Sequence, residues 1–499
     1  MEGERSMKSN ARRKLGMLAG VLALLLVLSA CSDTGGKSTS VFGGLDRDEA
    51  GTLKVAYFNE QAFYLQYGNA FQAMYPNMTI EVVSLEQVFQ AEDPVSEMEK
   101  MLGEQQPDVL HLTEDQYAAL AEKGLLYDLD AAIKQDEFDL DSFYPAVVEL
   151  LKARGGGKLY GLSPSFSSQA LYFNKGMFDQ YNIPYPRDGM SWEEVLQLAA
   201  RFPAQKDGDN ATHGLAQSSQ ANDLFALIRM IGEAKGLSYA DADAGQVTID
   251  SHEWKEIFQM VIDGYQSGSI SMPSDAPGGE RLMLGILAPG GGRTIGFGPD
   301  SMKFMTGQAA MMIDGSMLME MLRVNVNRGE AVRVQSNAAD SGANAGPRPR
   351  QLDSIDWDLV TVPVDPSQPD VMSGIGVDSI FAISASSDNP AAAWELLKYI
   401  NGEQLAKTSA RSSSAMSART AHKKVVEGKN VDAFYKLGIN EQLLLQSLPA
   451  GFADSFAQLA SGEIKRVVDG GATLDEAIAQ IASQGQQLLT DALLESDAS

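Results

Sequence analysis

Cysteine is nearly absent from this chain, since its 499 residues include only Cys31. A disulfide within the chain is therefore excluded, and the folded part must be stabilised by the burial of apolar side chains. Histidine is also scarce: the four residues are scattered, and no two have the i, i+4 spacing of a helical zinc site. We therefore expect no metal site and no cofactor.

Motifs of nucleotide-binding and hydrolytic enzymes are missing too. Gly155-Gly156-Gly157-Lys158 is followed by Leu159, where a phosphate-binding loop requires Ser or Thr. No Gly-x-Ser-x-Gly nucleophile motif occurs. Asp207-Gly208-Asp209 begins like a calcium loop but lacks the glycine at the sixth position and the closing glutamate. A glycoside hydrolase stays open as an alternative, because its two facing carboxylates form no recognisable motif in the sequence.

Positive charge is in short supply. The chain has 39 Lys and Arg residues against 66 Asp and Glu residues, which gives a formal net charge of −27. A surface this acidic repels nucleic acid and anionic lipid headgroups, so we expect no nucleic-acid partner.

Residues 1–30 have the layout of a secretory signal peptide. Basic residues come first, an apolar run follows at 15–30, and the run ends in Leu28-Ser29-Ala30-Cys31. As a helix this run would be about 24 Å long, short of the roughly 30 Å hydrocarbon core, which disfavours the alternative of an uncleaved membrane span. No second apolar run approaches the length of a span.

The end of this run, Leu28-Ser29-Ala30-Cys31, resembles the bacterial lipobox. The resemblance implies cleavage before Cys31, acylation of Cys31, and attachment to the cell membrane on its extracytoplasmic face. Two acyl chains suffice for lasting attachment. The stretch at 31–51 is rich in Ser, Gly and Asp, which predicts a flexible linker between the anchor and the folded part.

Beyond the linker, short apolar strands alternate with amphipathic helical patterns. We expect strands at 53–58, 78–82 and 107–112, with helices between them at 63–74 and 97–103. This alternation predicts an α/β fold with an open, mostly parallel sheet. Ligands bind beyond the carboxyl ends of such strands, a rule that points to Phe58-Asn59-Glu60 and Thr113-Glu114-Asp115.

Two further helix starts carry capping boxes, Ser191 with Glu194 and Thr473 with Glu476. In such a box the N-cap side chain accepts a hydrogen bond from the backbone N–H of the third helical residue. The acidic side chain of that third residue accepts one in return from the backbone N–H of the N-cap residue. A stretch rich in Gly and Pro at 277–299 predicts a loop.

Short motifs follow one another along most of the chain. They are Pro107-Asp108-Val109-Leu110, Gly157-Lys158-Leu159-Tyr160-Gly161-Leu162, Tyr172-Phe173-Asn174-Lys175, Ser191-Trp192-Glu193-Glu194, Gly307-Gln308-Ala309-Ala310-Met311, Ile313-Asp314-Gly315-Ser316 and Asn389-Pro390-Ala391-Ala392-Ala393-Trp394-Glu395. Their order and spacing resemble the family-1 extracellular solute-binding proteins of ABC importers, which include maltodextrin-binding proteins. The resemblance implies a two-lobed α/β fold of the periplasmic-binding-protein type (type II), with three interlobe crossings and a hinge.

The resemblance also implies where the lobes begin and end. The crossings are expected near 163–166, 357–363 and 401–408. One lobe is then formed by residues 51–163 and 363–401, and the other by residues 166–357 and 405–499.

Residue by residue, the resemblance implies a solute site with contributions from both lobes. The residues are Phe58, Asn59, Glu60, Glu114, Asp115, Ser165, Phe166, Ser167, Asp314, Met317, Gly376 and Asp378. Several of them have a structural alternative. Phe58 and Phe166 can belong to the core, Glu114 and Asp115 can stabilise a helix start, and Asp314 can cap a turn with Gly315.

Two positions depart from the family pattern. Relatives often carry a stacking tryptophan where Met317 stands, and some carry an aromatic residue where Leu112 stands. A thioether packs on a sugar face with less specificity than an indole. We expect stacking to come from Phe58, Phe166 or Tyr57 instead.

The function implied by the resemblance is that of a monomeric receptor without enzymatic activity. It captures a neutral solute, a sugar or oligosaccharide, by hinge closure and delivers it to the permease of an ABC transporter. Lys and Arg are missing from the candidate site residues, which disfavours an anionic solute, whereas the carboxylates leave a cationic one open. The alternatives are a membrane-tethered glycoside hydrolase and a sensor or adhesin that binds glycans.

Overall fold

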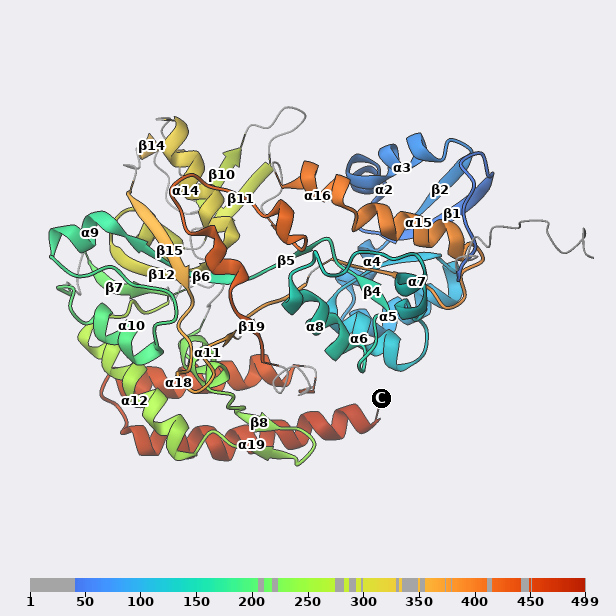
Figure 1. The fold of residues 1–499 in the computed structure, drawn as a ribbon. Coiled ribbons are helices and arrows are strands. Elements are labelled where there is room, and N and C mark those ends of the chain that lie inside the picture. The colour runs from blue at the N-terminus through green and yellow to red at the C-terminus, as the bar shows by residue number, and fades with distance from the viewer. Residues whose placement is uncertain are drawn as a thin grey trace, which may run out of the picture.

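The computed structural model describes residues 41–204, 211–217, 223–273, 282–286, 293–297, 299–328, 332–333, 349–350, 355–372, 374–377, 379–410, 415–440, 448–449 and 451–498. In these residues the chain forms two α/β lobes that meet around the short strand β5, Ser165–Phe166 (Figure 1). The predictions for Cys31 and Asp378 fall outside the described residues.

The first lobe is built on a five-stranded sheet with the order β2-β1-β3-β17-β4. Its strands are β1 (Gly51–Tyr57), β2 (Met78–Ser84), β3 (Val109–Leu112), β4 (Gly161–Leu162) and β17 (Ile380–Ile383). β1 runs parallel to β2 and β3, whereas β17 runs antiparallel to both β3 and β4. The five strands are drawn from two separate parts of the chain, 51–162 and 380–383.

Helices cover this sheet, so its central strands are apolar on both faces. Leu53, Val55 and Ala56 of β1 are fully buried. The helices are α2 (Glu60–Phe63), α3 (Asn69–Met74), α4 (Glu86–Gln90), α5 (Pro94–Gln105), α6 (Glu114–Glu122), α7 (Asp130–Gln135), α8 (Pro145–Arg154) and α15 (Pro390–Ile400), with the π-helical turn η1 (Tyr64–Gly68) between α2 and α3.

The second lobe is built on a four-stranded sheet with the order β15-β6-β12-β7. Its strands are β6 (Gln169–Asn174), β7 (His213–Ala216), β12 (Ala309–Gly315) and β15 (Trp357–Thr361). β12 runs antiparallel to β6 and parallel to β7. The surrounding helices are α9 (Lys175–Gln180), α10 (Trp192–Ala199), α11 (Ala226–Ala234), α12 (His252–Ser267), α13 (Pro299–Met305), α14 (Ser316–Arg328), α18 (Phe452–Val468) and α19 (Leu474–Ala498).

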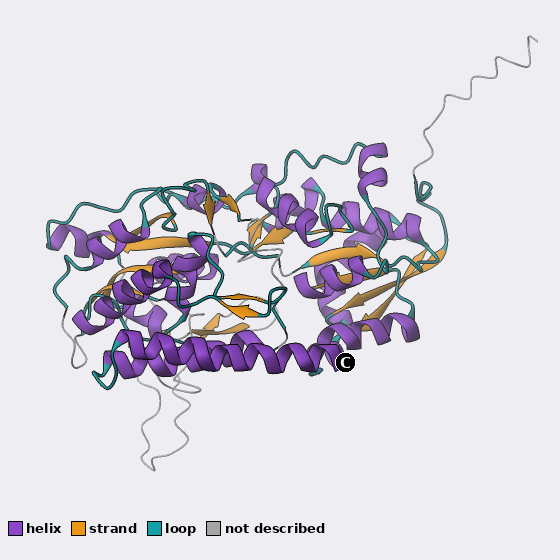
Figure 2. Ribbon diagram, turned by 90° about the horizontal axis from the view of Figure 1, so that it is seen from below, coloured by secondary structure: helices purple, strands orange, loops and turns teal. Residues whose placement is uncertain are grey.

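Small two-stranded sheets complete the second half of the chain. They are formed by β8 (Ala240–Asp241) with β9 (Gln246–Val247), β10 (Leu282–Ile286) with β11 (Arg293–Phe297), β13 (Val332–Arg333) with β14 (Pro349–Arg350), and β16 (Val371–Met372) with β19 (Gly438–Ile439). The loop predicted for 277–299 is therefore wrong in part. The apolar run Leu282-Met283-Leu284 outweighs the surrounding Gly and Pro residues and pairs with Ile295-Gly296-Phe297. Figure 2 shows α19 running along the underside of the second lobe toward the first.

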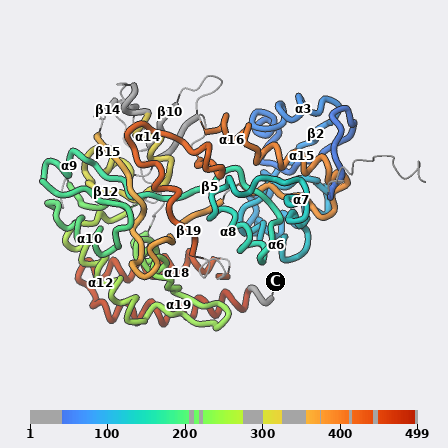
Figure 3. Tube along the Cα trace, in the orientation of Figure 1, coloured from blue at the N-terminus to red at the C-terminus, as the bar shows by residue number. Residues whose placement is uncertain are grey.

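Three segments connect the lobes, and they are hydrogen-bonded to one another. The first runs from β4 through β5 to β6, the second from β15 to β17, and the third from α15 through α16 (Glu403–Ser409) to β18 (Met416–Ser417). β5 pairs antiparallel with β18, and Ser167 pairs with Gly376 of the second segment. The connections therefore lie side by side at the centre of the molecule (Figure 3).

The residues just before β1 pack on the first lobe. The ring of Phe42 lies 5.2 Å from that of Tyr127 and 6.1 Å from that of Trp394, centroid to centroid. Asn77 donates a side-chain hydrogen bond of 2.9 Å to the carbonyl of Asp48. Residues 41–50, part of the linker expected at 31–51, thus contact the lobe. Among the described helices, none combines the length and the apolar character that a membrane crossing requires.

Candidate functional site

The carboxyl edge of the first sheet faces the second lobe. β17 is antiparallel to both β3 and β4, so β4 runs in the same direction as β3, β1 and β2. β4 ends at Leu162 and leads directly into the first crossing. The carboxyl ends of all four parallel strands therefore lie at the edge from which the chain leaves for the second lobe, where ligands of such sheets bind.

The second lobe presents β12 at the same junction. β12 is antiparallel to β6, with Gly315 opposite Gln169, so the carboxyl end of β12 lies where the chain enters from the first crossing. α14 begins immediately afterward, at Ser316. Residues predicted at 314–317 and those predicted at the first sheet's carboxyl edge thus flank the same crossing.

The segment after β1 projects side chains from this edge. Phe58 is 51% exposed, so about half of this large apolar side chain is in contact with water. Asn59 is the N-cap of α2, and its side-chain oxygen accepts a 2.8 Å hydrogen bond from the N–H of Ala62. Glu60 follows as an exposed carboxylate in the first turn. Phe58 thus lies outside the core, so the alternative that it is a core residue is wrong.

The two adjacent carboxylates that follow β3, those of Glu114 and Asp115, have different surroundings. Thr113 and Gln116 form a capping box that begins α6. Glu114 points inward, accepts a 2.7 Å hydrogen bond from the N–H of Val377, and forms a 3.5 Å ion pair with Nε of Arg154. Asp115 is exposed on the same turn. Glu114 therefore binds the second crossing, and Asp115 is the carboxylate presented to solvent.

The residues predicted in the first crossing are held mainly by the crossing itself. The ring of Phe166 is 2% exposed and lies 4.9 Å from that of Tyr144 and 5.1 Å from that of Tyr435. Ser165 pairs with Ser417 in the β5–β18 ladder. Phe166 thus belongs to the core, which was its structural alternative to contacting the solute. Its packing against the two tyrosine rings stiffens the first crossing.

Ser167 and Gly376 meet where the first and second crossings pair. The hydroxyl of Ser167 donates a 3.2 Å hydrogen bond to the carbonyl of Gly376. A Cβ atom on Gly376 would lie 3.0 Å from that hydroxyl oxygen and 3.3 Å from Oε1 of Glu114. Glycine at this position thus allows the second crossing to approach both side chains closely.

In the second lobe, Asp314 and Met317 take different positions. Asp314 is 5% exposed, and its carboxylate accepts a 2.7 Å hydrogen bond from the N–H of Gly315. The carbonyl of Gly315 accepts a 2.8 Å bond from the hydroxyl of Tyr172, which fixes the turn between β12 and α14. Met317 is 37% exposed in the first turn of α14. Of Asp314 and Met317, Met317 is therefore the side chain that is more exposed to solvent.

Sequence analysis missed one side chain at this edge. Phe89, on α4 after β2, is 41% exposed, and its ring centroid lies 5.9 Å from that of Phe58 at an interplanar angle of 48°. The rule that directed attention to the ends of β1 and β3 applies equally to β2. Applied there, it would have included residues 85–90.

His111 lies beneath the exposed residues, on β3. Its ring is 4.9 Å from that of Tyr57, and its Nε2 lies 3.2 Å from the hydroxyl of Ser379. Burial lowers the pKa of His111 from 6.5 to about 4, so its ring is neutral at pH 7. In the part of the chain that the structure describes, no group of three or more His, Cys, Asp or Glu residues is arranged to hold a metal ion.

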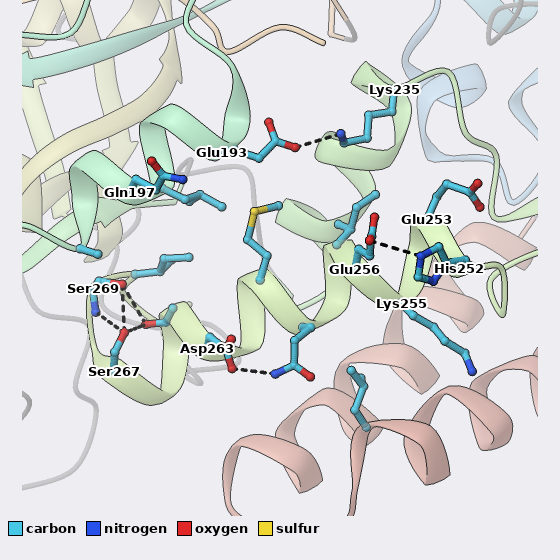
Figure 4. A pocket seen from close by; sticks show the side chains of 18 residues that line it. Glu193, Gln197, Lys235, His252, Glu253, Lys255, Glu256, Asp263, Ser267 and Ser269 are labelled. Carbon is cyan, nitrogen blue, oxygen red and sulfur yellow. Dashed lines mark hydrogen bonds and ion pairs between the residues drawn. The ribbon is translucent and has the colours of Figure 1, made fainter. Parts of the chain in front are cut away.

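A pocket of about 870 Å³ lies elsewhere, between α10 and α12 of the second lobe (Figure 4). Polar side chains along it pair with one another: Glu193 with Lys235 at 2.9 Å, His252 with Glu256 at 3.3 Å, and Gln259 with Asp263 at 2.7 Å. None of the predicted site residues lines it. We therefore place the candidate site at the facing strand ends and not in this pocket.

Comparison with known families gives an independent result. The model of the bacterial extracellular solute-binding protein family matches residues 66–436, which include the whole second sheet, the three crossings and every strand of the first sheet except β1. The chain belongs to this family. Among curated proteins, this solute-binding protein is 28% identical over 107 residues to a binding protein of Brucella abortus, and the match spans only 25% of that protein's length.

Solved structures share the fold over most of their length. A sugar transporter from Rhizobium etli in an open conformation has a TM-score of 0.60 at 18% identity, covering 88% of this chain and 99% of the other. The sugar-binding protein MalE from Xanthomonas citri has a TM-score of 0.59 at 14% identity, covering 90% and 100%. The GacH receptor of Streptomyces glaucescens, solved unliganded and with acarbose, has a TM-score of 0.54 at 17% identity, covering 89% and 100%. The two-lobed fold of this solute-binding protein is thus that of the family.

Proposed function

We propose that this solute-binding protein is a lipid-anchored receptor that captures a neutral oligosaccharide between its lobes and delivers it to the permease of an ABC transporter. The observation that carries the proposal is the exposed side chains at the strand ends that flank the crossings. Phe58 offers a flat apolar face, and Glu60 and Asp115 offer carboxylates at the same edge. Stacking on a ring face combined with directed hydrogen bonds to hydroxyls is the chemistry of sugar recognition.

Capture requires contact with both lobes, because a ligand shifts a conformational equilibrium only through its different affinity for the two states. Phe58 and Asp115 supply the contacts of the first lobe, and Met317 supplies one from the second. The three hydrogen-bonded crossings serve as the hinge. Closure then creates the surface that the permease recognises.

The charges at the site favour an uncharged solute. The exposed candidates carry carboxylates and no cationic side chain, so a phosphate ester or a uronic acid would meet like charge. Glu114 and Arg154 neutralise each other in their ion pair. An amine-bearing sugar is the charged solute that such a site tolerates.

The proposed output is binding without chemistry. Family membership and the structural neighbours support this part of the proposal, since they are binding proteins. The membrane anchor on Cys31, the extracytoplasmic location and the monomeric state are likewise proposed. Their support is the Leu28-Ser29-Ala30-Cys31 motif and the fold of the family.

Thermal unfolding of the purified protein with a panel of neutral sugars tests the proposal. The panel includes maltose, maltotriose, cellotriose and acarbose, and each sample is assayed in parallel for hydrolysis products. A sugar held at 100 times its dissociation constant stabilises the folded state by about 2.7 kcal/mol. We expect such a shift together with intact sugar and a smaller radius of gyration by solution scattering. Sugar cleavage, or no shift with any sugar, contradicts the proposal.

A further inference from the structure

The end of β2 adds an aromatic ring that the candidate site did not include. Phe58 and Phe89 are both more than two-fifths exposed, and their rings lie 5.9 Å apart. The two rings are tilted by 48° to each other and together leave a contiguous apolar area in contact with water, which is the kind of surface on which binding sites are sought.

These two rings are held in place by backbone bonds. Tyr57 at the end of β1 is paired with Ser84 at the end of β2, and the N–H of Leu85 donates to the carbonyl of Tyr57 at 2.9 Å. The hydroxyl of Ser84 donates to the carbonyl of Phe58 at 3.3 Å and accepts from the N–H of Glu86 at the same distance. The segments that carry Phe58 and Phe89 are thus joined, so the ring pair is preorganised.

The strand order gives the separation between the strands that lead to Phe89 and to Asp115. In the order β2-β1-β3-β17-β4, β2 is the outermost strand and β4 leads into the crossing. Asp115 follows β3, two strands inward from β2, which corresponds to roughly 10 Å at the usual strand spacing. α4, which carries Phe89, begins at Glu86, two residues after the end of β2 at Ser84. Asp115 and Phe89 therefore follow strands at different positions along the edge, and a solute of more than one ring is suited to contact both.

We propose that Phe89, together with Phe58, forms an outer subsite that stacks on a sugar ring remote from the crossings. This inference rests on the proposed function and adds the length of the solute to it. Asp115 and the crossing side of the edge bind the first ring, and the Phe58–Phe89 pair binds a later one. The receptor therefore selects oligosaccharides over monosaccharides.

The surroundings of the pair set the charge of the ring that it binds. The segments 58–60 and 84–90 contain Glu60 and Glu86 and no Lys or Arg. Aromatic faces are themselves electronegative and attract cations or polarised C–H groups, not anions. The outer subsite therefore takes a neutral or amine-bearing pyranose ring and excludes an acidic one.

A chain-length series tests this inference on the intact mature protein, extracted with its anchor in detergent. Calorimetric titration uses glucose, maltose, maltotriose and maltotetraose, with the cello-series in parallel. We expect Phe89→Ala to weaken binding of the three- and four-ring sugars at least tenfold and to leave glucose binding unchanged. Phe89→Trp should restore the affinity, and Phe89→Leu should restore only part of it, because a leucine is apolar but not flat.

Tyr181→Ala is the matched control. Tyr181 is 37% exposed and in edge contact with the ring of Phe202, but it lies at the end of α9, away from the strand ends. Its loss should leave every affinity unchanged. Equal affinities for wild type and Phe89→Ala overturn the outer subsite, and so does a loss that is the same for all chain lengths. A loss of transport with unchanged affinity assigns the pair to permease contact and likewise overturns it. If wild type binds no sugar, the proposed function itself fails.

Discussion

The carboxylate of Glu114 accepts a 2.7 Å hydrogen bond from the backbone N–H of Val377, so the first turn of α6 holds the second crossing to the first lobe. Val377 is 1% exposed, so its N–H has no access to bulk water. The ion pair with Arg154 adds α8 to the same contact. One carboxylate thus links a lobe helix, a crossing and a second helix.

Removing this carboxylate should destabilise the protein. Glu114→Ala leaves the buried N–H of Val377 without its acceptor, at a cost of about 1–3 kcal/mol. Glu114→Gln should cost less, because the amide oxygen still accepts the bond while the ion pair is lost. Urea unfolding of both variants measures the difference. Equal stability of Glu114→Ala and wild type would show that the bond contributes nothing.

The neighbouring carboxylate should behave in the opposite way. Asp115 is exposed, so Asp115→Ala should change the free energy of unfolding by no more than about 0.5 kcal/mol. If Asp115 binds a sugar hydroxyl, its loss should weaken binding about tenfold, which corresponds to about 1.4 kcal/mol. Calorimetric titration with the sugar identified in the thermal screen measures this effect. Unchanged affinity would remove Asp115 from the site.

His111 should make the protein less stable in mild acid. Its pKa is lowered from 6.5 to about 4 by burial, so the unfolded chain takes up a proton that the folded chain does not. The free energy of unfolding should therefore fall as the pH falls from about 6.5 to about 4, and level off below that range. A shift of this size corresponds to about 3 kcal/mol at most.

The pH effect is measured by urea unfolding at pH 7, 5.5 and 4.5. His111→Phe keeps a ring next to Tyr57 and Phe381 and removes the titrating group. Carboxylates titrate in both proteins, so their contribution cancels in the comparison. The wild type should lose more stability than the variant over this range. Parallel curves for the two proteins would contradict the assignment to His111.

The proposed anchor predicts a change of location. Cys31→Ser removes the sulfur to which a lipid would be attached, and the two acyl chains are the proposed source of lasting membrane binding. Export of this variant should yield protein in the soluble fraction, whereas the wild type sediments with membranes and incorporates labelled palmitate. Membrane association that survives the substitution would mean that another segment provides it.

Local patterns in the sequence predicted local structure well. The capping box at Ser191 is confirmed by two hydrogen bonds with Glu194, at 2.9 and 3.1 Å. The box at Thr473 is confirmed in the same way, with Glu476. Both boxes succeed because every group involved lies within three residues. The alternation of strands and helices likewise predicted the parallel strands of the first sheet, but not its antiparallel strand β17 or the antiparallel pairing of β6 with β12 and β15 in the second sheet.

The roles of individual side chains depended on contacts between distant segments. Phe166 is buried because Tyr144 and Tyr435 close over it, and one of these lies far away in the sequence. Glu114 and Asp115 look equivalent in the sequence, and only the position of Val377 separates them. Phe89 follows the buried Val88 in a short helix, and no local pattern indicates which of the two faces solvent.

The packing of Phe42 on Tyr127 and Trp394 holds the start of the described chain against the first lobe, which matters for the proposed anchor. If the anchor is at Cys31, ten residues lie between it and Phe42, and even a fully extended chain over these eleven Cα-to-Cα steps reaches only about 37 Å. The first lobe must then stay near the bilayer at all times. In the proposed receptor, closure around a solute would then be mainly a movement of the second lobe, with the first lobe kept near the membrane and its transporter.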